Sequence, residues 1–156
     1  MEDRCHDAVM AKHKVARSVV VDAPAKRIFD IIATPARHAE FDGSGTVLDT
    51  LFGPERLERG SEFGMDMRMF GVGYRMTNRV VEYEEDRLIA WRHFGPHRWR
   101  YELDELPGGG TRVTETFDYS RGLPAFYVLM GMPARNARSI ELTLGRLKAA
   151  AESDGA

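Results

Sequence analysis

One carboxyl group stands out as a candidate for acid–base chemistry. Glu115 lies in the alternating segment 111–120, where it shares one face with Val113 and Phe117. A carboxyl group among apolar side chains is costly unless it is paired, protonated or functional. Tyr101, in the preceding segment, is able to donate a hydrogen bond to it. Glu115 is therefore an acid or base whose pKa is raised by burial, a polar anchor for a ligand, or a solvated carboxylate near the open end of a sheet.

His93 is a second candidate, either as a general base or as a partly buried polar residue. His93 and His97 have a spacing that would suit a metal on one helical face, but the Phe-Gly-Pro sequence between them excludes that helix. We expect no metal site. The candidate catalytic residues are Glu115, His93 and Tyr101. The remaining histidines stand in polar surroundings and are expected to be solvated: His6, His13 and His38.

Other kinds of catalysis have no visible candidate. Cys5 is the only cysteine, which excludes an intramolecular disulfide and a thiolate metal cluster. The glycine run 108–110 leads into Thr-Arg and a strand rather than into Gly-Lys-Ser/Thr and a helix, so it is a hairpin turn and not a phosphate loop. No Gly-x-Ser-x-Gly sequence is present. We therefore expect no cofactor.

The composition fits one globular domain. The 156 residues include 22 basic and 24 acidic ones, so the basic surface typical of nucleic-acid binding is not evident. No apolar run approaches the roughly 20 residues of a membrane span, and the polar N-terminus lacks the apolar core of a secretory signal. The sequence predicts a cytoplasmic monomer or homodimer with a polar lead-in over residues 1–13.

An antiparallel sheet must position these candidates. Strand-like segments occupy residues 15–22, 45–53, 61–70, 72–83, 87–94, 97–106 and 111–120, and short turns connect the run that begins at residue 45. Segment 61–70 places Phe63, Met65, Met67 and Met69 on one face. Methionine is flexible and polarizable, and it is common at surfaces that adapt to varied apolar partners. This face is therefore either ordinary core or the wall of an apolar pocket.

One register of the last two strands satisfies both faces. It sets Leu103 opposite Val113, Trp99 opposite Phe117 and Tyr101 opposite Glu115 on the inside. On the outside it pairs Asp104 with Arg112 and Arg98 with Asp118. For segment 87–94 we favour the register with Trp91 beside Trp99 and His93 beside His97, because the alternative turns Arg92 and Phe94 inward.

Helical spacing occurs at two places. Residues 24–33 predict a short amphipathic helix, and a second short helix runs from Thr34, as N-cap, to about residue 40. From Pro124 onward, the spacing predicts one continuous helix of roughly 28 residues that covers the sheet, with a kink at Gly131-Met132-Pro133. Its apolar stripe comprises Phe126, Met130, Pro133, Ala137, Ile140, Leu144, Leu147 and Ala151.

Four blocks of the chain resemble a known superfamily. They are VARSVVVDAPAKRIFDIIATPARHAEFDG (15–43), DRLIAWRHF (86–94), PGGGTRVTETFDY (107–119) and LTLGRLKAAAES (142–153). Together they resemble the SRPBCC or START-like superfamily, particularly its polyketide cyclase/dehydrase branch. The resemblance implies one α+β domain over residues 14–153 with the helix-grip fold. In that fold a curved seven-stranded antiparallel sheet wraps a long C-terminal helix, and two short helices follow the first strand.

The resemblance also implies a hydrophobic cavity between sheet and helix, but no catalytic signature that can be transferred. We favour a module that binds a lipid-, polyketide- or aromatic-like molecule, because acid–base residues are few. A cyclase or dehydratase in which Glu115 or His93 moves a proton and Tyr101 steadies an enolate oxygen is the alternative. A co-chaperone-type interaction domain with a filled interior is the third. The expected ligand-binding residues are Met65, Met67, Met76, Asn78, Trp91, Trp99, Phe117, Tyr119, Phe126 and Met130.

Overall fold

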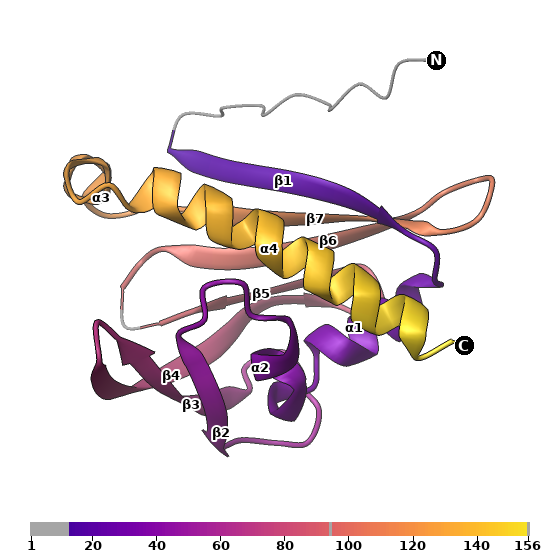
Figure 1. The fold of residues 1–156 in the computed structure, drawn as a ribbon, viewed down its shortest axis with the longest axis horizontal. Helices are drawn as coiled ribbons and strands as arrows, with labels where there is room; N and C mark the ends of the chain where they lie inside the picture. Colours follow the sequence, from indigo (N-terminus) through magenta and orange to yellow (C-terminus); the bar gives the residue numbers. More distant parts are fainter. Residues whose placement is uncertain (1–12, 94, 156) are drawn as a thin grey trace.

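A seven-stranded antiparallel sheet and one long helix form the two layers of the computed structural model, which describes residues 13–93 and 95–155 (Figure 1). The polar lead-in over residues 1–12, with Cys5 and His6, lies outside the described residues, as does Phe94. The strands are β1 (Lys14–Val21), β2 (Val47–Phe52), β3 (Glu62–Met69), β4 (Val72–Glu84), β5 (Leu88–Arg92), β6 (Arg98–Glu105) and β7 (Thr111–Asp118). The helices are α1 (Ala25–Ile32), the 3-10 turn η1 (Pro35–Arg37), α2 (His38–Phe41), α3 (Pro124–Leu129) and α4 (Met132–Ser153).

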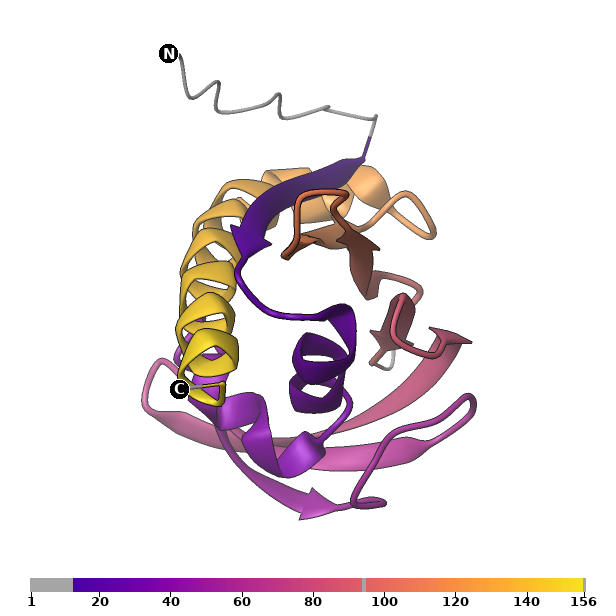
Figure 2. The same cartoon turned by 90° about the vertical axis from the view of Figure 1, so that its right-hand side faces the viewer.

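The sheet is strongly curved and partly encloses its helices. Its strand order is β1-β7-β6-β5-β4-β3-β2, so every link within β2–β7 joins adjacent strands and only β1 reaches across to β7. In the end view of Figure 2 the sheet bends around the space that α4 and α1 close. The predicted α+β architecture, a seven-stranded antiparallel sheet covered by a C-terminal helix, is confirmed. Among the described residues, no helix combines the length and apolar character that a membrane span requires.

The predicted register of the aromatic strands is confirmed. Tyr101 is the cross-strand partner of Glu115, and Trp99 is the partner of Phe117. The outer pairs of Asp104 with Arg112 and of Arg98 with Asp118 also form neighbours in the ladder. In β5, Trp91 faces Trp99, and Arg92 stays exposed. Alternation between apolar and charged positions thus fixes which side chains point toward α4.

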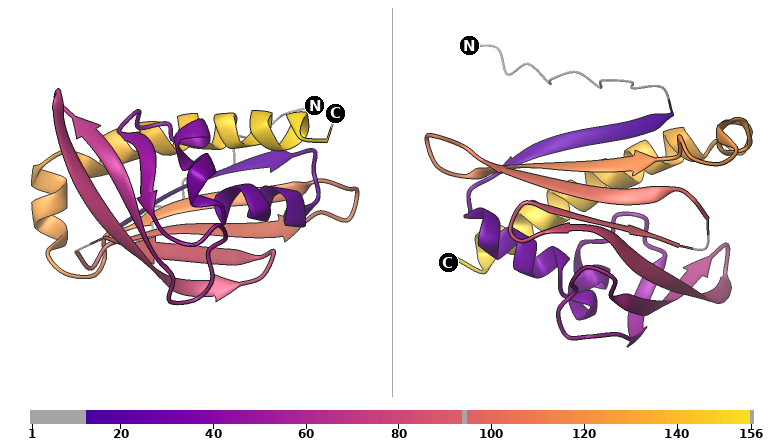
Figure 3. Two further views of the ribbon diagram at one scale, coloured as in Figure 1. Left: turned by 90° about the horizontal axis from the view of Figure 1, so that it is seen from below. Right: turned by 180° about the vertical axis from the view of Figure 1, so that it is seen from behind.

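The single kinked helix predicted from Pro124 onward is wrong. Two helices, α3 and α4, are separated at Gly131, whose φ of 68° is left-handed, a backbone conformation that favours glycine. Pro133 in the first turn of α4 has no backbone N–H to continue the preceding helix. Figure 3 shows α3 at the end of α4 remote from the C-terminus. None of the residues of α3 is buried.

The second short helix is also divided. It consists of η1 followed by α2, and Thr34 does not cap it with its side chain. The Thr34 hydroxyl instead donates to the carbonyl oxygen of Asp30 at 2.6 Å, one turn back in α1. A threonine hydroxyl can donate to the carbonyl oxygen four residues earlier, and in Thr34 this hydrogen bond replaces the predicted N-cap.

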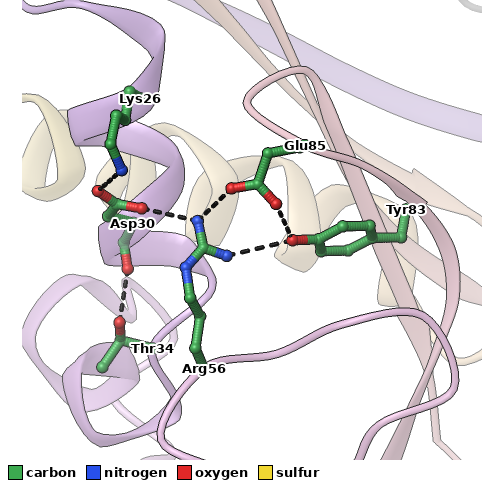
Figure 4. A network of polar contacts seen from close by, with 6 residues as sticks. All are labelled: Lys26, Asp30, Thr34, Arg56, Tyr83 and Glu85. Carbon is green, nitrogen blue, oxygen red and sulfur yellow. Dashed lines mark hydrogen bonds and ion pairs between the residues drawn. The ribbon is translucent and has the colours of Figure 1, made fainter.

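A polar network holds α1 against the loop before β3 and the turn after β4 (Figure 4). The Arg56 guanidinium donates to Asp30 Oδ1 at 2.7 Å, to Glu85 Oε1 at 2.6 Å and to the Tyr83 hydroxyl at 3.1 Å. It also lies 5.6 Å from the ring centre of Phe29. The helix α1 turns Ile28, Phe29 and Ile32 fully inward. By holding α1 in place, the network keeps these side chains in the core.

Candidate functional site

A cavity of about 770 Å³ lies between the curved sheet and α4. Ligand pockets typically occupy roughly 300–1,000 Å³, so this volume suits a drug-sized molecule. The sheet supplies an apolar wall because its inward positions are methionine and aromatic side chains. That wall comprises Phe63, Met65, Met67, Met69, Tyr74, Met76, Trp91, Trp99, Tyr101 and Phe117.

The helical side of the cavity is more polar than the sheet. At helical spacing along α4, the lining residues are Met132, Arg135, Asn136, Ser139, Ile140 and Thr143. Thr143 accepts a hydrogen bond from the Gly43 backbone N–H at 2.9 Å, which ties the loop after α2 to the helix. The amide nitrogen Nδ2 of Asn136 is buried and has no hydrogen-bond partner among the described residues.

Glu115 is buried in this lining rather than solvated, with 2% of its surface exposed. The Tyr101 hydroxyl donates to Glu115 Oε1 at 2.9 Å, whereas Oε2 is buried and has no hydrogen-bond partner among the described residues. Burial raises the pKa of Glu115 to about 8, with the hydrogen bond from Tyr101 opposing the rise and the charge of Asp42 adding to it. The carboxyl group is therefore mostly protonated and neutral at pH 7.

Two further histidines meet at the cavity. His93 lines it and donates from Nδ1 to Asn78 Oδ1, while His97 Nδ1 lies 2.9 Å from the Tyr127 hydroxyl. The two imidazole rings are 5.2 Å apart, as the favoured register requires. Burial, with a smaller effect of His97, lowers the pKa of His93 to about 3. His93 is thus neutral, which leaves Nε2 as a hydrogen-bond acceptor.

The expectation of a solvated His38 is wrong. His38 is 5% exposed, and its ring stacks on that of Trp91 with 5.1 Å between centres and 20° between planes. Its Nε2 donates to the carbonyl oxygen of Ile32 at 2.8 Å. Burial lowers the pKa of His38 to about 4 despite this hydrogen bond. His38 follows Pro35 by three residues and precedes Phe41 by three, and this spacing was the available signal that its ring shares a helical face with apolar neighbours.

Most of the residues expected at the site lie together in this cavity. Glu115, His93 and Tyr101 line it, as do Met65, Met67, Met76, Asn78, Trp91, Trp99 and Phe117. Tyr119 is buried in the core beside Phe117 and is not part of the lining. Phe126 and Met130 are not part of it either: they are 54% and 60% exposed, because the break at Gly131 carries α3 away from the sheet. The lining also includes residues that the sequence pattern did not predict for it: His38, Asp42, Tyr74, Arg135, Asn136 and Thr143.

Comparison with known proteins agrees with this geometry. Residues 12–152 match the family described as polyketide cyclase / dehydrase and lipid transport. The chain belongs to this family. Family and fold indicate a polyketide cyclase/dehydrase-like or ligand-binding domain. The resemblance to the SRPBCC superfamily is thereby confirmed.

One curated protein resembles the chain in sequence, and two solved structures share its fold. Protein Rv0088 of Mycobacterium tuberculosis, which is described as uncharacterized, is 46% identical over 140 residues that span 86% of this chain and 62% of the relative. The chain thus covers less than two thirds of that relative's length. Protein NE0264 of Nitrosomonas europaea superposes with a TM-score of 0.72 at 14% identity, over 94% of this chain and 99% of that one. An AHSA1-like protein of Aeromonas hydrophila gives 0.66 at 18% identity, over 91% and 94%.

Proposed function

We propose that the cavity binds a hydrophobic small molecule of the lipid, polyketide or aromatic kind, and that the neutral carboxyl group of Glu115 orients it. The observation that carries this proposal is a cavity of about 770 Å³ with a methionine and aromatic wall and one buried carboxyl oxygen that has no partner among the residues described by the structure. Because Tyr101 donates to Oε1, the proton of the neutral acid sits on Oε2. A carbonyl or hydroxyl oxygen of the ligand would accept it.

The affinity would come mainly from apolar area removed from water, and the direction of the ligand from a few polar groups. Met65 and Met67 face the ligand space from β3, and their flexible side chains allow ligands of differing shape to fit. The stacked rings of His38 and Trp91 form a stiffer part of the same wall. This combination favours binding of a class of apolar molecules over one rigid substrate.

A probe-binding experiment tests this function. Nile red, a neutral solvent-sensitive dye, is titrated into the wild-type protein and into the variant Met67→Trp, which fills the cavity. The matched control is Met130→Trp, at an exposed position outside the lining. We expect the cavity variant to lose dye affinity by at least about tenfold while the control keeps it.

Thermal unfolding followed by circular dichroism checks that Met67→Trp remains folded, and Met65→Phe serves as a milder filling variant. Mass spectrometry of molecules that remain bound after native purification identifies the ligand class. A wild-type protein that binds no dye and carries no small molecule would contradict the proposal and favour the interaction-domain alternative.

Acid–base catalysis is the second candidate, and the state of Glu115 is the observation that favours it. General acids and bases work best when their pKa lies near the working pH, and the pKa of Glu115, at about 8, lies near neutral pH. In a cyclase or dehydratase, Glu115 would move a proton of a bound poly-β-keto substrate, while Tyr101 steadies an enolate oxygen.

The variant Glu115→Gln separates the two functions. If Glu115 is the acid or base, the variant loses turnover of a short poly-β-keto thioester yet still binds it, because the amide keeps a donor at the same place. The matched control is Asp104→Asn, on the outer face of β6 opposite Arg112. Unchanged turnover in Glu115→Gln would rule out a catalytic role for this residue.

A further inference from the structure

Arg135 is a cation on α4 that lines the cavity and is also exposed to solvent. Arg135, Asn136 and Ser139 occupy successive cavity-facing positions of the helix. Among the described residues, the ion pairs of at most 4.0 Å do not include Arg135. A guanidinium next to a largely apolar cavity gains most from a planar anion that accepts two hydrogen bonds.

Neutral donors accompany this cation. The Nδ2 group of Asn136 is buried and unpartnered among the described residues. Tyr74, on the inner face of β4, lines the same cavity. Burial raises the pKa of the Tyr74 hydroxyl, the charge of Asp42 adds to the rise, and the charge of Arg135 opposes it. The lining also includes the exposed Arg68 and Arg75 on the strands. On the helical side, the one guanidinium of Arg135 and the two neutral donors match a monoanion.

The two acids of the lining, Asp42 and Glu115, form no ion pair with Arg135 in the part of the chain that the structure describes. The charge of Asp42 still acts on Tyr74 and Glu115. The carboxylate of Asp42 is engaged by its own turn, where it accepts the backbone N–H groups of Ser44, Thr46 and Val47 at 3.0, 3.1 and 3.0 Å. The buried Glu115 is mostly uncharged at pH 7 and so does not repel an anion. The histidines of the lining are neutral as well.

We propose that Arg135, Asn136 and Tyr74 form a subsite for a carboxylate, so that the ligand of the cavity is an apolar carboxylic acid. This inference rests on the proposed ligand-binding function. The acid group lies against α4, and the apolar body of the ligand lies on the methionine and aromatic wall of the sheet. The helical side of the cavity thus selects the head group, and the sheet accepts the varied remainder.

A matched pair of ligands tests the subsite. Displacement of Nile red is measured at pH 7 with dodecanoic acid and with its methyl ester, which differ in charge but share the apolar chain. We expect the acid to bind at least about tenfold more tightly than the ester to the wild-type protein. The variant Arg135→Gln should remove this preference and leave ester binding unchanged.

The control variant is Arg138→Gln, an exposed arginine of α4 outside the lining, which should keep the preference for the acid. Equal binding of acid and ester to the wild-type protein overturns the subsite while the cavity function stands. Failure of both ligands to displace the dye overturns the function as well. Tighter binding of dodecyl phosphate than of dodecanoic acid, with loss of that difference in Arg135→Gln, overturns the carboxylate assignment.

Discussion

Tyr101 and Glu115 are direct cross-strand partners in β6 and β7, and the tyrosine hydroxyl donates to the buried carboxyl group at 2.9 Å. Both residues belong to the regular ladder of the sheet, so neither depends on a loop for its position. Groups placed on sheet strands are held more firmly than groups on loops. The buried Glu115 therefore has a fixed place and a fixed hydrogen-bond donor.

Because Glu115 is buried, we expect the free energy of unfolding to depend on pH near neutrality. The folded-state pKa of Glu115 is raised to about 8 from an ordinary 4.5, so the folded protein holds a proton that the unfolded chain releases in this range. Stability contributed by this group is complete below about pH 4.5 and is lost as the pH rises toward 8, at up to about 1.4 kcal/mol per pH unit.

The buried histidines act in the opposite direction. Burial lowers the pKa of His38 to about 4 and of His93 to about 3, so below pH 6.5 the unfolded chain takes up protons that the folded protein excludes. We expect the free energy of unfolding to rise with pH up to roughly 6.5 and to fall from there to about 8. Urea unfolding across this range measures the curve. In Glu115→Gln the fall above 6.5 should disappear, and parallel curves for variant and wild type would contradict the assignment.

The variant Tyr101→Phe removes the donor without changing the ring. The carboxyl group then has no protein partner on either oxygen among the described residues, so we expect a loss of about 1–3 kcal/mol in the free energy of unfolding at pH 7. Because the bond from Tyr101 lowers the pKa of Glu115, the pH at which stability stops falling should move upward. If Tyr101→Phe unfolds at the same urea concentration as the wild type, the hydrogen bond contributes nothing to the free energy of unfolding.

Replacement by alanine should change the free energy of unfolding with opposite signs at Gly43, which packs against α4, and at Gly145, which lies within α4. A Cβ atom at Gly43 would lie 2.4 Å from both the Ser139 carbonyl oxygen and the Thr143 nitrogen, which are backbone atoms of α4 and cannot move aside cheaply. We expect Gly43→Ala to cost about 1–3 kcal/mol. Gly145→Ala meets open space on the exposed side of α4 and should stabilise by about 0.5–1 kcal/mol. Calorimetric melting of both variants compares them, and equal shifts would refute the close approach of the loop to the helix.

His38 offers a test of the aromatic wall. The variant His38→Phe keeps a planar ring against Trp91 but removes the hydrogen bond to the Ile32 carbonyl. Leaving that carbonyl unpaired should cost about 1–3 kcal/mol at pH 7, and the loss of stability below pH 6.5 should become less steep because one buried base is gone. Chemical unfolding at pH 5 and pH 7 measures both effects. A variant with an acid limb as steep as that of the wild type would contradict the depressed pKa of His38.

The sheet could be predicted from the sequence because two independent patterns agree there. Apolar residues meet inside at Trp99 and Phe117, and opposite charges meet outside at Asp104 and Arg112, so only one register satisfies both faces. The cavity lining from β6 and β7 follows from that register, and the lining from β3 follows from the alternation of apolar residues along that strand. Its position opposite α4 follows from the need to cover one apolar face.

The helical side of the cavity could not be predicted in the same way. The apolar spacing of Phe126 and Met130 continues in phase with Ala137 across Gly131, so periodicity alone does not distinguish a kink from a break. Burial of His38 depends on Trp91, a residue far along the chain, and no local pattern records such a contact. The polar lining of α4 depends on how the helix is rotated above the sheet, which is set by packing against β1 and α2.

Gly131, which has a left-handed backbone conformation, separates a segment that tolerates insertions and deletions from one that does not. A residue inserted in α3 changes a helix without buried side chains, and the groups above the cavity keep their places. A residue inserted in α4 after Asn136 rotates the preceding residues of the helix by about 100° relative to the sheet. Arg135 and Asn136 would then leave the cavity. We expect members of the family that share this lining to vary in length before Gly131 and to keep a constant spacing from Arg135 to Thr143.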